Sequence, residues 1–426
     1  MTYADIILPL PLEGYFTYCV PDTLAPRLQP GCRVRVPLGK TKTYTGLVAA
    51  LHDQLPAGLK TGKEGVKSIV EMMDPGPVLL PQQLRLWQWI ADYYLSPIGD
   101  VYKAALPSGL KAEDDYRPKT ETYVVLADDF RSAQALRAAQ AMLQRAPAQQ
   151  KVLRAYLELA SVSEENPVPQ REITREELMN ESHCTTTVLR QFLDRRILRQ
   201  YEKEVGRIPL GGMPHPEHIK PLSEAQADAY NQILVQQMSK DITLLHGVTS
   251  SGKTEIYIHL IQRALDEGRQ VLYLLPEIAL TVQMMQRLRR VFGDRLGIYH
   301  SRYSDAERVE IWKRQLSDHP YDVILGARSA LFLPFQRLGL VIVDEEHEQS
   351  FKQMDPAPRY HARSAAIILA KLCGAKVLLG TATPSSESYW NAQTGKYGYV
   401  RLDKRYQDMA LPAVEVVDVK DLRRRK

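Results

Sequence analysis

The chain has 426 residues, of which 44% are hydrophobic and 25% charged, and its net charge is +5 at pH 7. These values are ordinary for a soluble globular protein of about three domains, and the mild positive charge permits an anionic partner without requiring one. No apolar run approaches the ~18 residues needed to span a bilayer and no secretion signal begins the chain, so we expect a cytoplasmic protein without membrane contact. Four widely spaced cysteines without a C-x-x-C pair argue against a disulfide framework and against a zinc site.

Residues 1–110 are predicted to form a β-rich unit. Short stretches with strand character occur at 6–12, 15–20, 31–40, 43–51 and 67–73. Strands at such close spacing indicate a small β-barrel or sandwich. The prolines in the first stretch favour an edge position for that strand. A helix is predicted over 82–94, and we expect its Trp87 and Tyr93 to pack in the core.

Residues 113–205 are predicted to form a winged-helix domain. The expected strands lie at 120–127 and 197–205, and the expected helices at 134–145, 149–160, 171–178 and 185–195. The order helix, turn, helix, strand at the end of this unit is typical of a winged helix. Such a domain places its second helix in the major groove of DNA or contacts other proteins, and the sequence leaves both open. Polar residues at 111–119 and the Pro- and Gly-rich stretch 206–221 are predicted linkers.

Residues 206–426 alternate between strands and helices, which predicts a parallel α/β sheet. The expected strands are 241–246, 270–275, 322–325, 339–343 and 376–379. The expected helices are 223–239, 254–267, 279–292, 304–316, 361–373 and 385–394. Such sheets bind ligands at the carboxyl ends of their strands.

A complete G-x-x-x-x-G-K-T pattern spans residues 247–254, between a predicted strand and a predicted helix. Its loop, with Gly247, Thr249 and Gly252, is expected to turn backbone N–H groups towards the phosphates of ATP. Lys253 is expected to reach the β- and γ-phosphates, and Thr254 to hold Mg²⁺. A chance glycine turn is the alternative, but both the spacing and the flanking elements fit the phosphate loop.

A glutamine stands upstream of the phosphate loop. Gln226 is a candidate reader of the adenine edge, because its amide carries a paired donor and acceptor. The alternative is a capping box, in which Ser223 and Gln226 close the first turn of a helix. Both roles are compatible with each other.

An apolar strand ends in the acidic sequence 344–347. Asp344 is expected to hold the same Mg²⁺ as Thr254, and Glu345 to orient or deprotonate the attacking water. His347 is expected to hydrogen-bond to the segment 380–385, or else to be a solvated loop histidine.

The segment 380–385 follows another predicted strand. Its Thr381 and Thr383 are candidates for sensing the γ-phosphate and for coupling hydrolysis to bound nucleic acid. The alternative is a helix N-cap formed by Thr383 or Ser385.

The segment 348–363 interleaves aromatic and basic residues in a loop with two prolines. Phe351 and Tyr360 are candidates for stacking on bases, and Lys352, Arg359 and Arg363 for contacting phosphates. Arg328, at the end of another strand, is a further candidate for a nucleic-acid backbone. The alternative is a surface loop with one buried aromatic residue.

Several motifs together carry a family resemblance, at 274–281, 326–332, 344–347, 359–363 and 380–384, and near the N-terminus at 34–40 and 92–101. The chain resembles the PriA family of bacterial primosomal replication-restart helicases, within superfamily 2. The resemblance implies a RecA-like motor lobe and ATP-dependent 3′-to-5′ unwinding of DNA. The partners that it implies are forked and single-stranded DNA with a 3′ end, the single-stranded DNA-binding protein and primosome proteins.

By the same resemblance, the N-terminal domain grips the 3′-terminal nucleotide. Phe16, Thr17, Gly39 and Lys67 fall at the positions of the family's pocket. Thr17 departs from the acidic residue expected there, which puts the strength of 3′-end selectivity in question.

In the family, a second motor lobe with an arginine finger, a zinc-binding insert and a C-terminal domain follow this region. These parts are expected beyond Lys426. An arginine finger accelerates phosphoryl transfer about 10³- to 10⁵-fold. We therefore expect this chain alone to bind nucleotide weakly and to hydrolyse little of it. One competing class is a kinase or switch GTPase, which is disfavoured because no N-K-x-D-like guanine reader occurs. Another is a non-catalytic fork or 3′-end DNA-binding fragment with a nucleotide-binding lobe.

Overall fold

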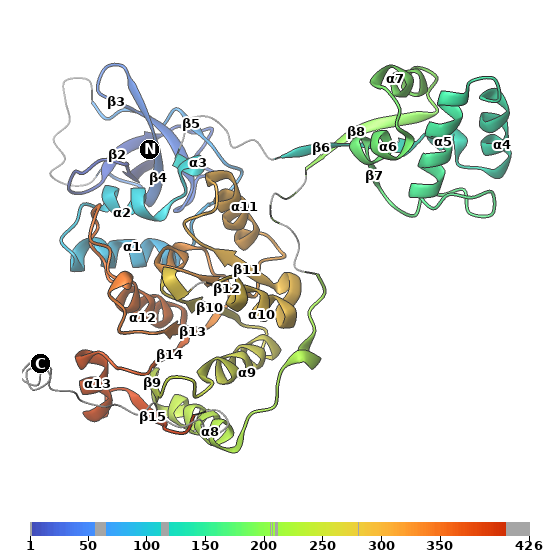
Figure 1. Cartoon of the computed structure of the whole chain (residues 1–426). Helices are drawn as coiled ribbons and strands as arrows, with labels where there is room; N and C mark the ends of the chain where they lie inside the picture. Colours follow the sequence, from blue (N-terminus) through green and yellow to red (C-terminus); the bar gives the residue numbers. More distant parts are fainter. Residues whose placement is uncertain are drawn as a thin grey trace, which may run out of the picture. The chain divides into compact units, whose positions relative to one another are not determined.

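The computed structural model describes residues 2–55, 65–111, 119–204, 206, 208, 212–279 and 281–405. Residues 112–118 of the first predicted linker, residues 207 and 209–211 of the second, and the basic residues 421–426 lie outside the described residues. The chain divides into two compact units (Figure 1). The larger unit combines Met1–Tyr116 with Leu210–Lys426, and the smaller unit is Arg117–Pro209.

The N-terminal part of the larger unit is a five-stranded antiparallel sheet in the order β2-β1-β4-β3-β5. The strands are β1 Thr2–Ile7, β2 Phe16–Val20, β3 Arg33–Leu38, β4 Lys42–His52 and β5 Glu71–Met72. The residues before β5 turn back to β2, where the Cys19 amide donates to the Lys67 carbonyl (2.8 Å) and the Ile69 amide to the Cys19 carbonyl (3.0 Å). The sheet therefore curls towards a barrel around buried aliphatic side chains such as Ile6 and Val34.

The predicted edge position of the first strand is wrong. β1 pairs with β2 on one side and with β4 on the other. Its pairing ends at Ile7, so Pro9 and Pro11 lie beyond the strand and remove no hydrogen bond from the ladder.

Helices α1 Pro81–Tyr93, α2 Ile98–Ala105 and α3 Ser108–Lys111 follow the sheet. Trp87 is fully buried, as predicted, but Tyr93 is 64% exposed, so its predicted core position is wrong. α1 and its flanks also contact the C-terminal part of the unit, because Gln83 Nε2 donates to the Phe332 carbonyl (2.6 Å) and Trp312 Nε1 to the Val78 carbonyl (2.8 Å). The first 110 residues thus share a continuous interface with the lobe that follows.

That lobe is built on a seven-stranded sheet in the order β11-β12-β10-β13-β14-β9-β15, with every recorded pairing parallel. Its strands are β9 Ile242–Gly247, β10 Gln270–Leu274, β11 Leu296–Tyr299, β12 Val323–Gly326, β13 Leu338–Asp344, β14 Lys376–Thr381 and β15 Gly398–Leu402. Its helices are α8 Glu224–Ser239, α9 Lys253–Asp266, α10 Val282–Phe292, α11 Asp305–Leu316, α12 Ala362–Cys373 and α13 Ser386–Gln393. The predicted parallel sheet is confirmed, and β11 and β15 are additional strands.

The smaller unit has a three-stranded sheet in the order β7-β6-β8. Its strands are β6 Thr120–Leu126, β7 Ile173–Thr174 and β8 Leu198–Glu204, and its helices are α4 Ala133–Met142, α5 Pro147–Leu159, α6 Arg175–Ser182 and α7 Thr186–Asp194. The core joins apolar residues of all four helices, including Leu136, Leu153, Leu178 and Phe192. The predicted order of helix, turn, helix and strand is therefore present as α6, α7 and β8.

Among the described helices, none is both long and apolar enough to cross a lipid bilayer.

Candidate nucleotide site and nucleic-acid contacts

The phosphate loop joins β9 to α9 at the carboxyl edge of the sheet. Two of its residues adopt left-handed backbone conformations, Ser250 with φ +61° and Gly252 with φ +79°. A Cβ atom on Gly252 would lie 2.2 Å from the Gln226 side-chain nitrogen Nε2, so Gln226 would have to shift, and the left-handed backbone would strain any other residue. Left-handed residues between right-handed ones turn successive N–H groups inward and form an anion-binding concavity. Lys253 follows at the start of α9 and donates to the Gly247 carbonyl (2.9 Å).

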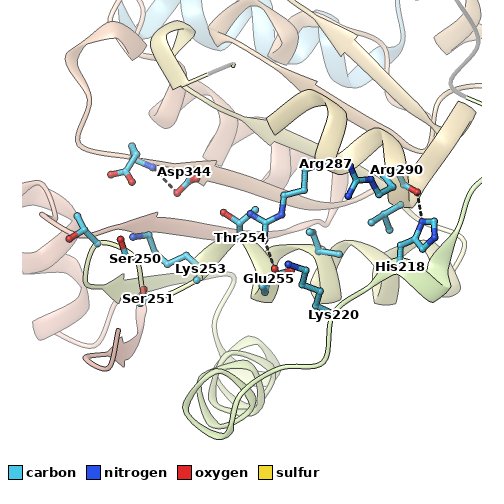
Figure 2. Close-up of a pocket in the computed structure, with 15 residues that line it drawn as sticks. His218, Lys220, Ser250, Ser251, Lys253, Thr254, Glu255, Arg287, Arg290 and Asp344 are labelled. Atoms are coloured by element: carbon cyan, nitrogen blue, oxygen red, sulfur yellow. Dashed lines mark hydrogen bonds and ion pairs between the residues drawn. The ribbon is translucent and has the colours of Figure 1, made fainter. Parts of the chain in front are cut away.

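The loop forms one end of a cavity of about 730 Å³. Residues 249–254 line this end together with Asp344 and Glu345 from the end of β13 (Figure 2). The fold thus brings together the residues predicted to bind phosphate, to hold the metal ion and to orient water, although they lie far apart in the sequence.

Asp344 is the most perturbed acid of the cavity. Tyr257 and Tyr273 donate hydroxyl hydrogen bonds to its two carboxylate oxygens at 2.9 and 3.3 Å. Burial, and secondly the charge of Glu345, raise the pKa of Asp344 from 3.8 to about 6. Glu345 has φ +49°, a left-handed conformation that costs energy for a residue with a side chain and that concentrates at functional sites.

His347 connects the acidic motif to the segment after β14. Its Nδ1 lies 2.7 Å from Thr381 Oγ1, and its Nε2 lies 3.3 Å from Thr383 Oγ1. The predicted contact between His347 and this segment is therefore present, while its coupling role stays a prediction. The Ser385 side chain accepts a hydrogen bond from the Ser388 amide and so caps α13. This is the helix N-cap that was the alternative prediction for this segment.

Gln226 lies beneath the phosphate loop and is 1% exposed. Its Oε1 accepts from the Ser223 amide (2.9 Å), and its Nε2 donates to the Ser251 carbonyl (3.1 Å). The capping box is confirmed. The candidate role in reading adenine needs correction, because the amide is already bonded to protein atoms at both ends and does not line the cavity.

The far end of the cavity was missed by sequence reasoning. Figure 2 shows Lys220 and His218 from the predicted linker opposite Arg287 and Arg290 of α10. The linker is held there because the His215 amide donates to the Val291 carbonyl at 2.8 Å. These residues lie within the Pro- and Gly-rich stretch 206–221, whose sequence has no periodicity that could predict this packing.

The candidate DNA contacts of the segment 348–363 separate into buried and exposed residues. Phe351 and Tyr360 are fully buried, and Tyr360 packs edge-on against Phe332 at 5.2 Å between ring centroids. Their predicted stacking on bases is therefore wrong. Arg363 is also turned inward, where its Nη1 donates to Glu346 Oε2 at 2.5 Å, so its predicted phosphate contact is wrong.

The other basic candidates are accessible. The Lys352 ammonium donates to the Arg359 carbonyl, and the Arg359 guanidinium donates to the Met354 carbonyl at 2.9 Å. Arg359 is exposed and Lys352 is half-buried. Arg328 donates to the Ser350 carbonyl at 3.3 Å. These cations remain candidates for phosphate contacts.

Of the four candidates for the 3′-end pocket, Phe16 and Thr17 lie in β2, Gly39 directly follows β3, and Lys67 lies in the segment before β5. Lys67 donates to the Gly39 carbonyl, and its neighbour Ser68 bridges to Cys19, two residues after Thr17 and three after Phe16. Thr17 Oγ1 donates to Asp5 Oδ1 across the β1–β2 pair at 2.7 Å. An acidic group is thus present beside position 17, although the sequence lacks one at that position.

Three family models match successive parts of the chain. Residues 5–107 match the PriA 3′ DNA-binding domain, residues 121–205 match a winged-helix domain of PriA helicase described for Bacteroidota, and residues 223–390 match the DEAD/DEAH box helicase model. The predicted winged helix and the helicase-type lobe are thereby confirmed.

Individual relatives cover nearly the whole chain. The replication restart protein PriA of Haemophilus influenzae is 33% identical over 99% of this chain and 54% of that protein. PriA of Bacillus subtilis is 31% identical over 99% of this chain and 58% of that protein. The solved UvsW helicase of bacteriophage T4 overlaps with a TM-score of 0.32 and 19% identity, over 46% of this chain and 64% of that one. The chain spans about half the length of the curated relatives it matches, and over nearly its whole length it is similar to the replication restart protein PriA.

Proposed function

We propose that this chain forms the ATP-binding and DNA-end-binding part of an ATP-dependent 3′-to-5′ DNA helicase that acts in replication restart. The observation that carries the proposal is the single cavity that joins Lys253 and Thr254 of the phosphate loop to Asp344 and Glu345 of β13. A nucleotide triphosphate, a metal ion and a water molecule need these groups on one side of a shared space.

Within this site, Lys253 and the loop amides bind the β- and γ-phosphates. Thr254 and Asp344 offer the hard oxygen ligands that Mg²⁺ prefers, and the ion supplies positive charge that neutralises the phosphate oxygens. Glu345 orients the attacking water. His347 and Thr381 relay the state of the γ-phosphate to β14.

The substrates proposed are forked and single-stranded DNA with a 3′ end, and the proposed partners are the single-stranded DNA-binding protein and primosome proteins. Asp5 and Thr17 on β1 and β2, with Gly39 and Lys67 nearby, support an end-binding pocket on the N-terminal sheet. A hydroxyl-carboxylate pair accepts the hydrogen bond of a 3′-hydroxyl and repels a 3′-phosphate.

Replacing Lys253 by alanine is expected to weaken the binding of Mg·ADP about 10- to 150-fold, because a charge-assisted contact to phosphate is lost. Isothermal titration measures this affinity, and the anisotropy of a labelled fork measures DNA binding, which should not change. Lys371→Ala removes an exposed lysine of α12 and should leave both affinities intact. An unchanged nucleotide affinity in Lys253→Ala would place the nucleotide elsewhere.

The far end of the cavity is proposed to hold the base of the nucleotide. Lys220 and Arg290 line the cavity together with the apolar side chains of Ile258 and Val291, and cations beside apolar surface suit a flat aromatic ring. Lys220→Ala and Arg290→Ala are each expected to weaken ADP binding about 2- to 30-fold. Inorganic pyrophosphate should bind almost as well as before.

Calorimetry with ADP and with pyrophosphate separates base contacts from general attraction between charges. Gln286→Ala, an exposed change on the same helix as Arg290, serves as the control. Equal losses for ADP and pyrophosphate would contradict the assignment of this end to the base.

A further inference from the structure

One face of α1 carries an aromatic stack made of the exposed Tyr93 and the half-buried Trp89. The rings of Trp89 and Tyr93 lie nearly parallel, with centroids 4.8 Å apart and an interplanar angle of 18°. The four-residue spacing that brings them together continues one turn earlier to the exposed Arg85. Tyr93 is 64% exposed, so much of its ring is open to solvent.

This stack does not belong to the core of α1. The core face is formed by Leu86, Trp87 and Ile90, all fully buried, and Trp87 packs edge-on against Tyr102. The helix is therefore anchored without Trp89 and Tyr93. A rigid pair of rings held by an anchored helix is a preformed surface for a flat apolar ligand.

Tyr94 connects the stack to the lobe that carries the nucleotide site. It lies edge-on to both rings, at 5.9 Å from Trp89 and 5.0 Å from Tyr93. Its hydroxyl accepts from the His361 amide at 3.1 Å, and the Lys352 ammonium lies 5.0 Å from its ring centroid. The aromatic stack therefore adjoins Lys352, a half-buried cation of the segment that follows the acidic motif.

We propose that Trp89, Tyr93 and Lys352, hereafter the aromatic platform, bind single-stranded DNA. Unpaired bases stack on the exposed ring of Tyr93, supported from behind by Trp89, while Lys352 and Arg85 contact the phosphates on either side. The inference rests on the proposed function and adds a base-stacking site outside the 3′-end pocket. A purely apolar protein partner suits the patch less well, because cations border the rings.

The direct test uses the whole chain and a fluorescein-labelled oligo(dT). Trp89→Ala and Tyr93→Ala are each expected to weaken binding about 5- to 150-fold, whereas Tyr93→Phe, which keeps the ring, retains most of the affinity. Trp390→Ala removes a tryptophan that is 68% exposed on α13 and should not change the affinity. Thermal unfolding confirms that each variant is folded.

Tryptophan fluorescence gives a second readout. Titration with unlabelled oligo(dT) is expected to quench the wild-type emission by stacking near Trp89, and Trp89→Phe should remove that quenching while preserving most of the binding. If wild type binds oligo(dT) but both alanine variants bind equally well, the platform is wrong and the proposed DNA function stands. If wild type binds neither oligo(dT) nor forked DNA, both are wrong.

Discussion

Replacing Arg363 by alanine is expected to destabilise the larger unit by about 3–5 kcal/mol, the usual cost of leaving a buried charge without its partner. The partner is Glu346, whose side chain is 0% exposed, while that of Arg363 is 12% exposed. Burial alone would raise the pKa of Glu346. Hydrogen bonds from the Ser385 amide and the Ser388 hydroxyl, with the charge of Arg363, instead hold this pKa below its ordinary value.

The hydrogen bonds of Glu346 and Arg363 lie at the nucleotide edge of the sheet, so the structural disturbance in Arg363→Ala should be centred there. Arg363 Nη1 donates to the Ser385 hydroxyl at 2.6 Å, and the Glu346 carboxylate accepts from the Ser385 amide at 2.7 Å. Glu346 therefore ties the end of β13 to the start of α13. Removing the cation loosens the loop that presents Glu345 and His347.

Chemical denaturation of the variants measures the effect. Arg359→Ala removes an exposed arginine of the same segment and should change the unfolding free energy by less than about 0.5 kcal/mol. The double change Arg363→Met with Glu346→Gln should recover much of the loss, because no buried charge is left unpaired. A stable Arg363→Ala protein with weakened oligo(dT) binding would instead restore the phosphate contact inferred from the sequence.

The acidic motif illustrates what a sequence determines. The apolar run before it and the spacing from the phosphate loop were enough to predict that β13 delivers Asp344 and Glu345 to the nucleotide edge. They did not reveal that Glu346 turns inward. That depends on Arg363 and Ser385, which meet it only after the chain has folded.

The burial of the aromatic residues could not be predicted from the sequence. A local pattern shows that a helix or loop contains rings, but burial is decided by whichever element packs over them. Phe351 and Tyr360 are covered within the larger unit, whereas Tyr93 stays exposed although it stands on a helix with a buried face. The segment 218–220 shows a further limit, since it contributes to the cavity through tertiary contacts without any periodicity of its own.

Replacing Asp344 by asparagine is expected to stabilise the nucleotide-free protein at pH 8 and to remove its Mg·nucleotide binding. The folded-state pKa of about 6 lies above the ordinary value of 3.8. The stability linked to this group is therefore complete below pH 4 and is lost as the pH rises through 6. A pKa difference of about 2 corresponds to about 3 kcal/mol at pH 8, which a neutral amide of the same shape recovers.

The pH dependence is the decisive measurement. Denaturation at pH 8 should show Asp344→Asn to be the more stable protein, and at pH 4 the difference should vanish. Asp318→Asn, an exposed change in the same lobe, should have no effect at either pH. Mg·ADP should raise the wild-type midpoint far more than that of the variant, because ligand binding stabilises only a protein that binds it. If Asp344→Asn instead lowers stability at pH 8, the hydrogen bonds of Asp344 with Tyr257 and Tyr273 outweigh the cost of burying its charge, and Asp344 is a packing residue. If stability rises while Mg·ADP binding falls, the lobe keeps a destabilising carboxylate because the metal site requires it.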